Sequence, residues 1–168
     1  MRNIKKSFNK KLINSTKLNE SRLKKILNIF KAPSASLNTS KYLLWVLEKA
    51  KVKSKILNLG SGTKQLRKDN INLDIEPFKN VNIVGDGSNL PILSNSFDVV
   101  ICQAVLEHLK EPKDVIKEIY RVLKIGGLIY IEVPFIQGYH ADPDDYQRFT
   151  LRGLEYLLKE FYKIESGI

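Results

Sequence analysis

The alternation of short apolar runs with amphipathic segments from Lys55 onward constrains the fold more than any other feature of the sequence. Runs of strand length predict strands at residues 56–59, 71–75, 81–84, 97–102, 128–133 and 162–168. Apolar side chains at helical spacing predict helices at residues 115–123 and 151–161. Apolar strands separated by helices are typical of an α/β fold, in which a parallel sheet is covered by helices on both faces.

The N-terminal third of the chain differs from the rest in charge. Residues 1–55 hold 15 of the 28 lysines and arginines but only two of the 18 acids. Two helices are predicted there, one after Ser15 or Thr16 and one after Thr39 or Ser40. We expect residues 1–54 to form a basic helical extension and residues 55–168 to form the ligand-binding domain. The basic helices are either cap helices with solvated lysines, or they form a binding surface for nucleic acid or an anionic membrane.

Residues able to hold a nucleoside follow several of the predicted strands. In chain order they are Gly60, Ser61, Gly62, Asp74, Asp86 and Gln103. Because the carboxyl ends of parallel strands share one edge of a sheet, we expect these residues to face one crevice. Glycines let a ligand approach the backbone closely. A carboxylate at the end of the second strand can accept hydrogen bonds from both hydroxyls of a ribose.

The glycine pattern argues against a dinucleotide as the ligand. A dinucleotide site needs Gly-x-Gly-x-x-Gly at the start of a full helix, with an acid about 20 residues later. Here Gln65 stands in place of the third glycine, Asp74 comes too early, and residues 60–70 leave little room for a helix. A ligand with ribose and adenine but without phosphates fits better, and we expect S-adenosylmethionine.

Residues 56 to about 165 resemble class I S-adenosylmethionine-dependent methyltransferases of the type 11 group. The resemblance runs through "ILNLGSGT", "INLDI", "VGDGSNLPILSNSFDVVICQAVLEHL" and "IKEIYRVLKIGGLIYIEVPF". The tail "YHADPDDYQRFTLRGLEYLL" resembles a subgroup associated with methylation of small molecules, glycans or envelope precursors. The resemblance implies a Rossmann-like sheet, methyl transfer, and a usual C-terminal strand that is missing from this sequence.

The resemblance also implies roles for individual residues. The residues implied to bind the cofactor are Asn58, Gly60, Ser61, Gly62, Asp74, Ile75, Asp86, Gly87 and Gln103. The glycine turn and Gln103 would border the methionine part, Asp74 would hold the ribose, and Ile75 would pack on the adenine. The adenine edge would be recognised by the Asp86–Gly87 pair. Two positions depart from the family pattern: Asn58 replaces an acid, and Lys64 replaces a third glycine and implies an altered turn.

Methyl transfer of this kind needs neither a metal ion nor a covalent residue, because the protein mainly aligns donor and acceptor in a dry site. We therefore expect no metal site. If the acceptor is a hydroxyl, a base helps to remove its proton, and His140 is the candidate for that base or for orienting the substrate. The candidates for contact with the substrate are His108, Tyr146 and Arg148. Arg148 could equally pair with one of the aspartates of the same loop.

Three functions stay open from the sequence alone. They are a small-molecule or glycan methyltransferase, an RNA methyltransferase that uses the basic N-terminal segment, and a non-catalytic binding module of degenerate sequence. No apolar stretch is long enough to cross a bilayer and no secretory signal is visible, so we expect a cytoplasmic protein. Cys102 is the single cysteine, which excludes a cysteine-based zinc cluster, and its apolar surroundings predict a buried thiol. The oligomeric state is not indicated.

Overall fold

The computed structural model describes residues 39–166, which belong to one unit of the chain, residues 38–168. The helix predicted after Ser15 or Thr16 and the greater part of the basic segment lie outside the described residues, so both interpretations of that segment stay predictions. The same holds for the expected domain boundary after residue 54. No helix within the described range is long and apolar enough to cross a membrane.

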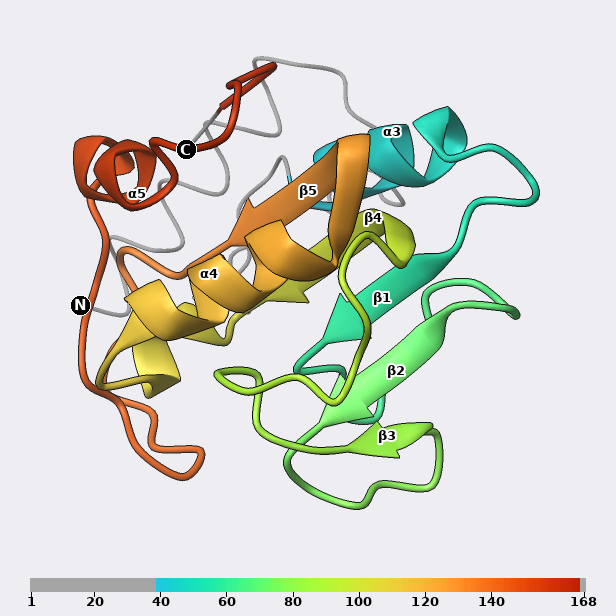
Figure 1. Cartoon of the computed structure of the whole chain (residues 1–168). Coiled ribbons are helices and arrows are strands. Elements are labelled where there is room, and N and C mark those ends of the chain that lie inside the picture. The colour runs from blue at the N-terminus through green and yellow to red at the C-terminus, as the bar shows by residue number, and fades with distance from the viewer. Residues whose placement is uncertain (1–38, 167–168) are drawn as a thin grey trace, which may run out of the picture. The chain divides into compact units, whose positions relative to one another are not determined.

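A parallel sheet of five strands forms the centre of the described unit (Figure 1). The strands lie in the order β3-β2-β1-β4-β5, and each neighbouring pair is parallel. Their bounds are β1 Ile56–Leu59, β2 Ile71–Asp74, β3 Ile83–Val84, β4 Phe97–Gln103 and β5 Leu123–Glu132. The predicted α/β fold is confirmed. All five carboxyl ends lie at one edge of the sheet, where the residues proposed to bind a ligand follow the strands.

Helices cover both faces of the sheet, as the sequence predicted. Because side chains alternate between the faces of a strand, Leu57 packs on one face with α4 (Pro112–Val122), whereas Ile56 packs on the other with α3 (Thr39–Lys49). In Figure 1, α4 lies in front of the sheet. The contact of α3 with the sheet is made by Val46, which is 5% exposed, and by Leu43 and Leu47 beside it. The contact concerns only the second of the two predicted N-terminal helices, and the cap-helix interpretation of the whole segment stays a prediction.

The start of β5 differs from the prediction. The strand begins at Leu123 rather than at residue 128, because Leu123 already pairs with Phe97. The next pair is Val99 with Leu128, so the residues between them bulge out of the ladder. Gly126, with φ +75°, lies in this bulge. The Gly126–Gly127 pair therefore lies inside the strand and does not separate the helix from it.

The last predicted elements are shorter than the sequence suggested. Helix α5 spans Leu151–Leu157, and the hydroxyl of Thr150 caps it by accepting a hydrogen bond from the backbone N–H of Gly153 at 3.0 Å. The prediction of a sixth strand is wrong for residues 162–166, which form no strand. Tyr162 is 92% exposed, so this apolar run is not buried against the sheet. Apolar residues alone do not produce a strand where no neighbouring strand offers a ladder.

An ion pair fixes the connection between β3 and β4 to helix α4. Glu118 accepts hydrogen bonds from the guanidinium of Arg121 at 2.6 and 2.8 Å and from the backbone N–H of Leu90 at 2.7 Å. Arg121 donates in turn to the carbonyls of Leu90 and Ile92. These two charged side chains thus hold the loop against α4.

Candidate cofactor and acceptor site

The turn after β1 is held against the end of β2 by backbone hydrogen bonds. The N–H groups of Gly60 and Ser61 both donate to the carbonyl of Leu73, at 2.8 and 3.2 Å. The N–H of Gly62 donates to the Asp74 carboxylate at 2.7 Å. The glycine turn and Asp74 are therefore parts of one structure, as the shared edge of the sheet predicted.

Two glycines of this turn have left-handed backbones, for which glycine is the favoured residue. Gly60 has φ +66° and Gly62 has φ +51°. A Cβ at Gly60 would overlap the side chain of Val105, whereas a Cβ at Gly62 would meet nothing within 4 Å. Gly60 is thus required by packing, and Gly62 borders open space that a ligand could enter. Lys64 is not among the residues with positive φ, so its backbone does not require the third glycine of the family pattern.

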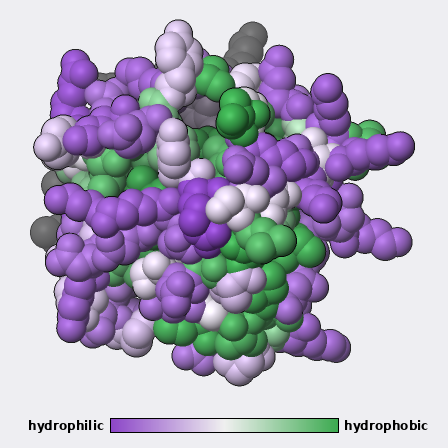
Figure 2. Space-filling view, viewed as in Figure 1, coloured by the Kyte–Doolittle hydropathy of each residue, from purple (hydrophilic) through white to green (hydrophobic). Residues whose placement is uncertain are grey.

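Asp74 ends β2 with its carboxylate already engaged on one side. One oxygen accepts from the N–H of Gly62 and the other from the N–H of Glu76 at 3.0 Å. A carboxylate oxygen can accept more than one hydrogen bond, so these contacts orient the group without using its full capacity. The next residue, Ile75, is 63% exposed. Figure 2 shows hydrophobic surface around β2 and β3, where Ile75 and Val84 are exposed apolar residues.

The Asp86–Gly87 pair lies beyond β3, at the same edge of the sheet. The carboxylate of Asp86 accepts hydrogen bonds from the backbone N–H of Ser88 at 2.8 Å and from its hydroxyl at 2.7 Å. This is the local turn that aspartate commonly forms. Gly87 approaches the core, because a Cβ there would lie 3.5 Å from side-chain atoms of Leu59 and Val115. The exposed Asp86 is available to a ligand only from the side that Ser88 leaves open.

Asn58 lies on the α3 side of the sheet, in a buried network of side-chain amides. Its amide nitrogen donates to the side-chain oxygen of Asn72 at 3.0 Å. Asn72 donates to Gln65 at 2.7 Å, and Asn70 donates to Asn72 at 2.6 Å. Asn58 thereby supports the connection between β1 and β2, which contains no helix in residues 60–70, as the sequence predicted. Direct contact between Asn58 and a cofactor stays a prediction.

Gln103 ends β4 and is joined to the end of β5. Its amide nitrogen donates to the Glu132 carboxylate at 3.0 Å. The next residue, Ala104, has φ +51° and donates its N–H to the carbonyl of Glu132 at 2.9 Å. These contacts turn the chain sharply at the end of β4 and direct it into the short helix η1 (Leu106–His108).

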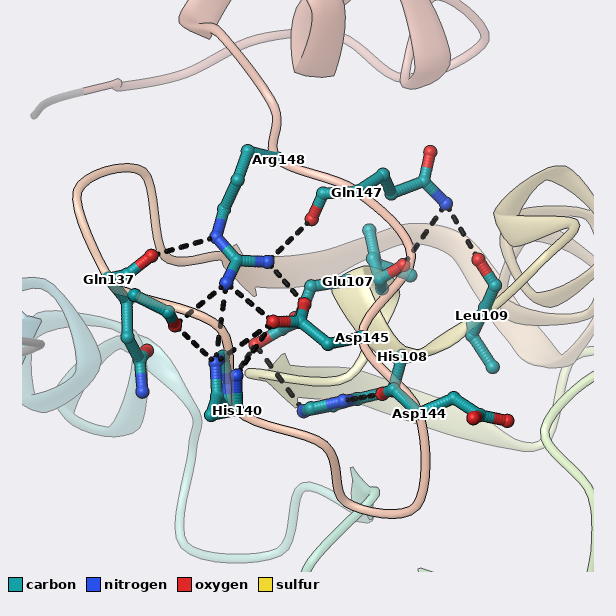
Figure 3. Close-up of polar contacts among 11 residues, drawn as sticks. Glu107, His108, Leu109, Gln137, His140, Asp144, Asp145, Gln147 and Arg148 are labelled. Atoms are coloured by element: carbon teal, nitrogen blue, oxygen red, sulfur yellow. Dashed lines mark hydrogen bonds and ion pairs between the residues drawn. The ribbon is translucent and has the colours of Figure 1, made fainter.

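The loop after β5 packs on η1 and brings the remaining candidate residues together (Figure 3). The N–H groups of Tyr146 and Gln147 donate to the carbonyl of Glu107 at 2.8 and 3.3 Å. The side chain of Gln147 donates to the carbonyl of Leu109 at 2.7 Å. The loop is thus fixed to η1 by its backbone, which places His140 beside His108 with ring centroids 5.0 Å apart.

Arg148 is engaged within this loop. Its guanidinium forms a bidentate ion pair with Asp145 and donates to the carbonyls of Gln137 and Gly138 at 3.2 and 3.0 Å. The guanidinium, together with the N–H of His140, holds the pKa of Asp145 well below its usual range. Of the two roles that the sequence left open for Arg148, these contacts favour the pairing with an aspartate. The hydroxyl of Tyr146 donates to Asp144 at 2.8 Å, which raises the pKa of that tyrosine.

Glu107 is the residue of this region that the sequence analysis missed. Its side chain is fully buried between His108 and His140. Burial raises the pKa of Glu107, although the two imidazoles and Arg148 act in the opposite direction. In the sequence, a glutamate beside a histidine in "LEHL" looks like an ordinary helical residue. The one sequence signal for a buried carboxylate here was that Glu107 directly follows the apolar residues 104–106.

Comparison with known proteins decides the family. A model of the family described as "Methyltransferase domain", type 11, matches residues 39–131, which is more than half of the chain. The chain belongs to this family. It is thus a class I methyltransferase domain, of a family whose cofactor is S-adenosylmethionine, and the resemblance noted in the sequence is confirmed.

Two curated proteins and one solved structure illustrate the likeness. The ubiquinone biosynthesis O-methyltransferase of Pseudomonas putida (strain F1) is 36% identical over 67 residues, 40% of this chain and 26% of that protein. The thiol S-methyltransferase TMT1B of Rattus norvegicus is 41% identical over 63 residues, 37% of this chain and 24% of that protein. A SAM-dependent methyltransferase from Archaeoglobus fulgidus has the same fold, with a TM-score of 0.59, 18% identity, and coverage of 73% of this chain and 66% of that one.

The chain matches only about a quarter of the length of these curated relatives. Their acceptors also differ, since one name states an O-methyltransferase and the other a thiol S-methyltransferase. The likeness therefore gives the family and the cofactor class but not the acceptor. The open space at Gly62, the oriented Asp74 carboxylate and the exposed Ile75 together fit a cofactor that has an amino-acid part, a ribose and a base.

Proposed function

We propose that the protein transfers a methyl group from S-adenosylmethionine to a small-molecule or glycan acceptor, such as an envelope precursor. The observation that carries this proposal is the turn after β1, in which Gly62 borders open space while its N–H holds the Asp74 carboxylate. Both features have a purpose if a ligand enters beside the turn and Asp74 accepts hydrogen bonds from its hydroxyl groups.

The proposed acceptor side is the loop after β5 together with η1. When bound, the cofactor supplies an electrophilic methyl group on its sulfonium. The chain itself has to bind the cofactor, orient the acceptor toward that methyl group and exclude water from the site. We retain His140 as a residue that orients the acceptor. We do not assign it the role of base, because its Nδ1 lies 3.2 Å from the carbonyl of Gly138 and its Nε2 faces Glu107 at 3.8 Å.

A cytoplasmic location stays a prediction.

The test is calorimetric titration of the full chain with S-adenosylmethionine, beside an Asp74→Asn variant. The substitution keeps the shape of the side chain but removes the charge that strengthens hydrogen bonds to the ribose. It also replaces one of the two oxygens that accept from Gly62 and Glu76 by an amide nitrogen, so circular dichroism has to show that the variant folds. Loss of a charge-assisted hydrogen bond costs about 1.5–3 kcal/mol. We therefore expect cofactor binding by the natural chain and an affinity about 10–100-fold lower in Asp74→Asn.

A matched control is Asp69→Asn. Asp69 is a carboxylate in the same connection, 58% exposed at the side chain and paired with Arg67, but it precedes β2. It should leave the affinity unchanged. Absence of binding by the folded natural chain would overturn the methyltransferase proposal and leave the non-catalytic binding module. Equal affinities for the natural chain and Asp74→Asn would overturn the placement of the ribose.

A further inference from the structure

Glu107 is a buried carboxylate without a hydrogen bond to its oxygens. Its side chain is 0% exposed, and neither Oε1 nor Oε2 has a hydrogen-bond partner among the described residues. Buried carboxylates are costly unless they are paired, hydrogen-bonded or bound to a metal ion. Each unsatisfied buried group of this kind therefore needs an explanation.

Two imidazoles face this carboxylate without bonding to it. The Nε2 atoms of His108 and His140 lie 3.7 and 3.8 Å from Oε1 of Glu107. Both distances exceed the 2.7–3.2 Å of an ordinary N–H···O hydrogen bond. In Figure 3 the two rings lie beside each other below Glu107, and both face the same carboxylate oxygen. One atom from each of the three residues can be chosen so that all lie within 4.8 Å of one another.

The hydrogen bonds on the far side of each ring decide which nitrogen carries the proton. Nδ1 of His108 lies 2.5 Å from the carbonyl of Asp144, and Nδ1 of His140 lies 3.2 Å from the carbonyl of Gly138. A carbonyl only accepts, so each Nδ1 is assigned the proton in the neutral ring. A guanidinium nitrogen of Arg148 lies farther from the same His140 atom, at 3.4 Å. Each Nε2 then directs its lone pair toward the carboxylate.

This arrangement matches the usual outer shell of a metal site. Histidines that bind a metal through one nitrogen donate the other N–H to a carbonyl or carboxylate, which fixes the ring. Nδ1 of His140 has a carbonyl partner of this kind in Gly138, whereas Asp145 Oδ2, at 3.6 Å, is too far from Nδ1 for a hydrogen bond. Tetrahedral ligands at about 2.1 Å from a zinc ion stand about 3.4 Å from one another. The observed 3.7 and 3.8 Å need a contraction of only a few tenths of an ångström, whereas the two imidazole nitrogens, within 4.8 Å of each other, need to approach by up to about 1.4 Å.

We propose that Glu107, His108 and His140 bind a divalent transition-metal ion, with Zn²⁺ as the best match to two imidazoles and a carboxylate. The ion would neutralise the buried carboxylate and join η1 to the loop after β5. Three ligands leave a position open for a water molecule or an acceptor atom. This site goes beyond the proposed methyl transfer and beyond the expectation of no metal in the sequence analysis. If it exists, His140 acts on the acceptor through the ion.

The experiment is titration of the untagged, chelator-treated full chain with Co²⁺ and Zn²⁺, followed by visible absorption and calorimetry. The chain has only two histidines, and both belong to the site, so imidazole ligation can come from nowhere else. We expect about one ion per chain. Loss of a partner that only orients a ligand costs about 10–100-fold in affinity, so loss of a ligand in Glu107→Gln or His140→Gln should cost at least about 100-fold.

Further measurements separate metal binding at these three residues from unspecific metal binding at surface carboxylates. Glu111→Gln removes an exposed carboxylate from the connection between η1 and α4 and should leave the affinity unchanged. Circular dichroism reports whether each variant folds, and NMR of the two imidazoles of the natural chain should show both Nε2 resonances shifting with Zn²⁺. The absence of Co²⁺ and Zn²⁺ binding by the folded chain would overturn the proposal. Binding that is as tight in folded Glu107→Gln would overturn it too. Neither result depends on cofactor binding.

Discussion

Replacement of Gly60 by alanine tests how the turn after β1 is built. The backbone of Gly60 has φ +66°, and a Cβ there would overlap Cγ2 of Val105. Gly62, two residues later, has φ +51° but open space within 4 Å. The two glycines thus differ in one respect, because both have a left-handed backbone and only Gly60 is packed against a side chain.

The expected destabilisation follows from these two contributions. A left-handed backbone costs an L-residue about 1–2 kcal/mol, and forcing an extra methyl group into a packed region costs about 1–3 kcal/mol. Gly60→Ala should therefore lower the free energy of unfolding by about 2–5 kcal/mol. Gly62→Ala should lower it by only about 1–2 kcal/mol, since only the backbone term applies.

The measurement is urea denaturation of the natural chain, Gly60→Ala, Gly62→Ala, Val105→Ala and the double variant Gly60→Ala/Val105→Ala. If Val105 is the obstacle, its truncation should recover part of the loss in Gly60→Ala, with a coupling free energy of about 0.5–3 kcal/mol. Equal destabilisation by the two glycine substitutions, together with additive effects of Gly60→Ala and Val105→Ala, would refute the packing argument.

Two further outcomes can be checked with the same protein. Hydrogen bonds from Arg121 and from the N–H of Leu90 lower the pKa of Glu118 in the folded protein. The stability that Glu118 contributes is therefore present above its unfolded pKa of about 4.3, and it is lost as the pH falls through its folded pKa. Glu118→Gln should thus lower the free energy of unfolding by about 1 kcal/mol at pH 7, as followed by urea denaturation. The difference should vanish once the pH has fallen below the folded pKa of Glu118, and a difference that persists in strong acid would contradict this. Cys102 is 0% exposed, and burial raises the pKa of its thiol. A thiol reagent should therefore label Cys102 only in denaturant, as followed by mass spectrometry. Rapid labelling of the native protein would contradict the burial of Cys102.

Much of the fold could be predicted because its signals are local. The apolar run Ile56–Leu59 followed by Gly60 predicts a buried strand and a tight turn from neighbouring residues alone. The bounds that failed depend on partners elsewhere in the chain. β5 starts early because Phe97 offers a pairing to Leu123, and residues 162–166 lack a strand because a strand requires a neighbouring ladder.

The candidate site divides in the same way. Glycines, an acid at the end of β2 and the order of the strands suffice to predict one crevice, since parallel strands bring their carboxyl ends together. Asn58 shows the limit of this reasoning, because its amide turns to Asn72 on the α3 side of the sheet. Position along a strand gives the face of the sheet, but the partner of a buried amide is set by the neighbouring strand.

The sequence by itself determined the parallel α/β sheet, the glycine turn and the family, because periodicity, turn residues and motif order are properties of short segments. Only the tertiary structure decided that His140 meets Glu107. The loop after β5 folds back onto η1 through hydrogen bonds from Tyr146 and Gln147 to the Glu107 carbonyl. The burial that raises the pKa of Glu107 also depends on this packing, since a carboxyl group loses water only when distant segments close around it.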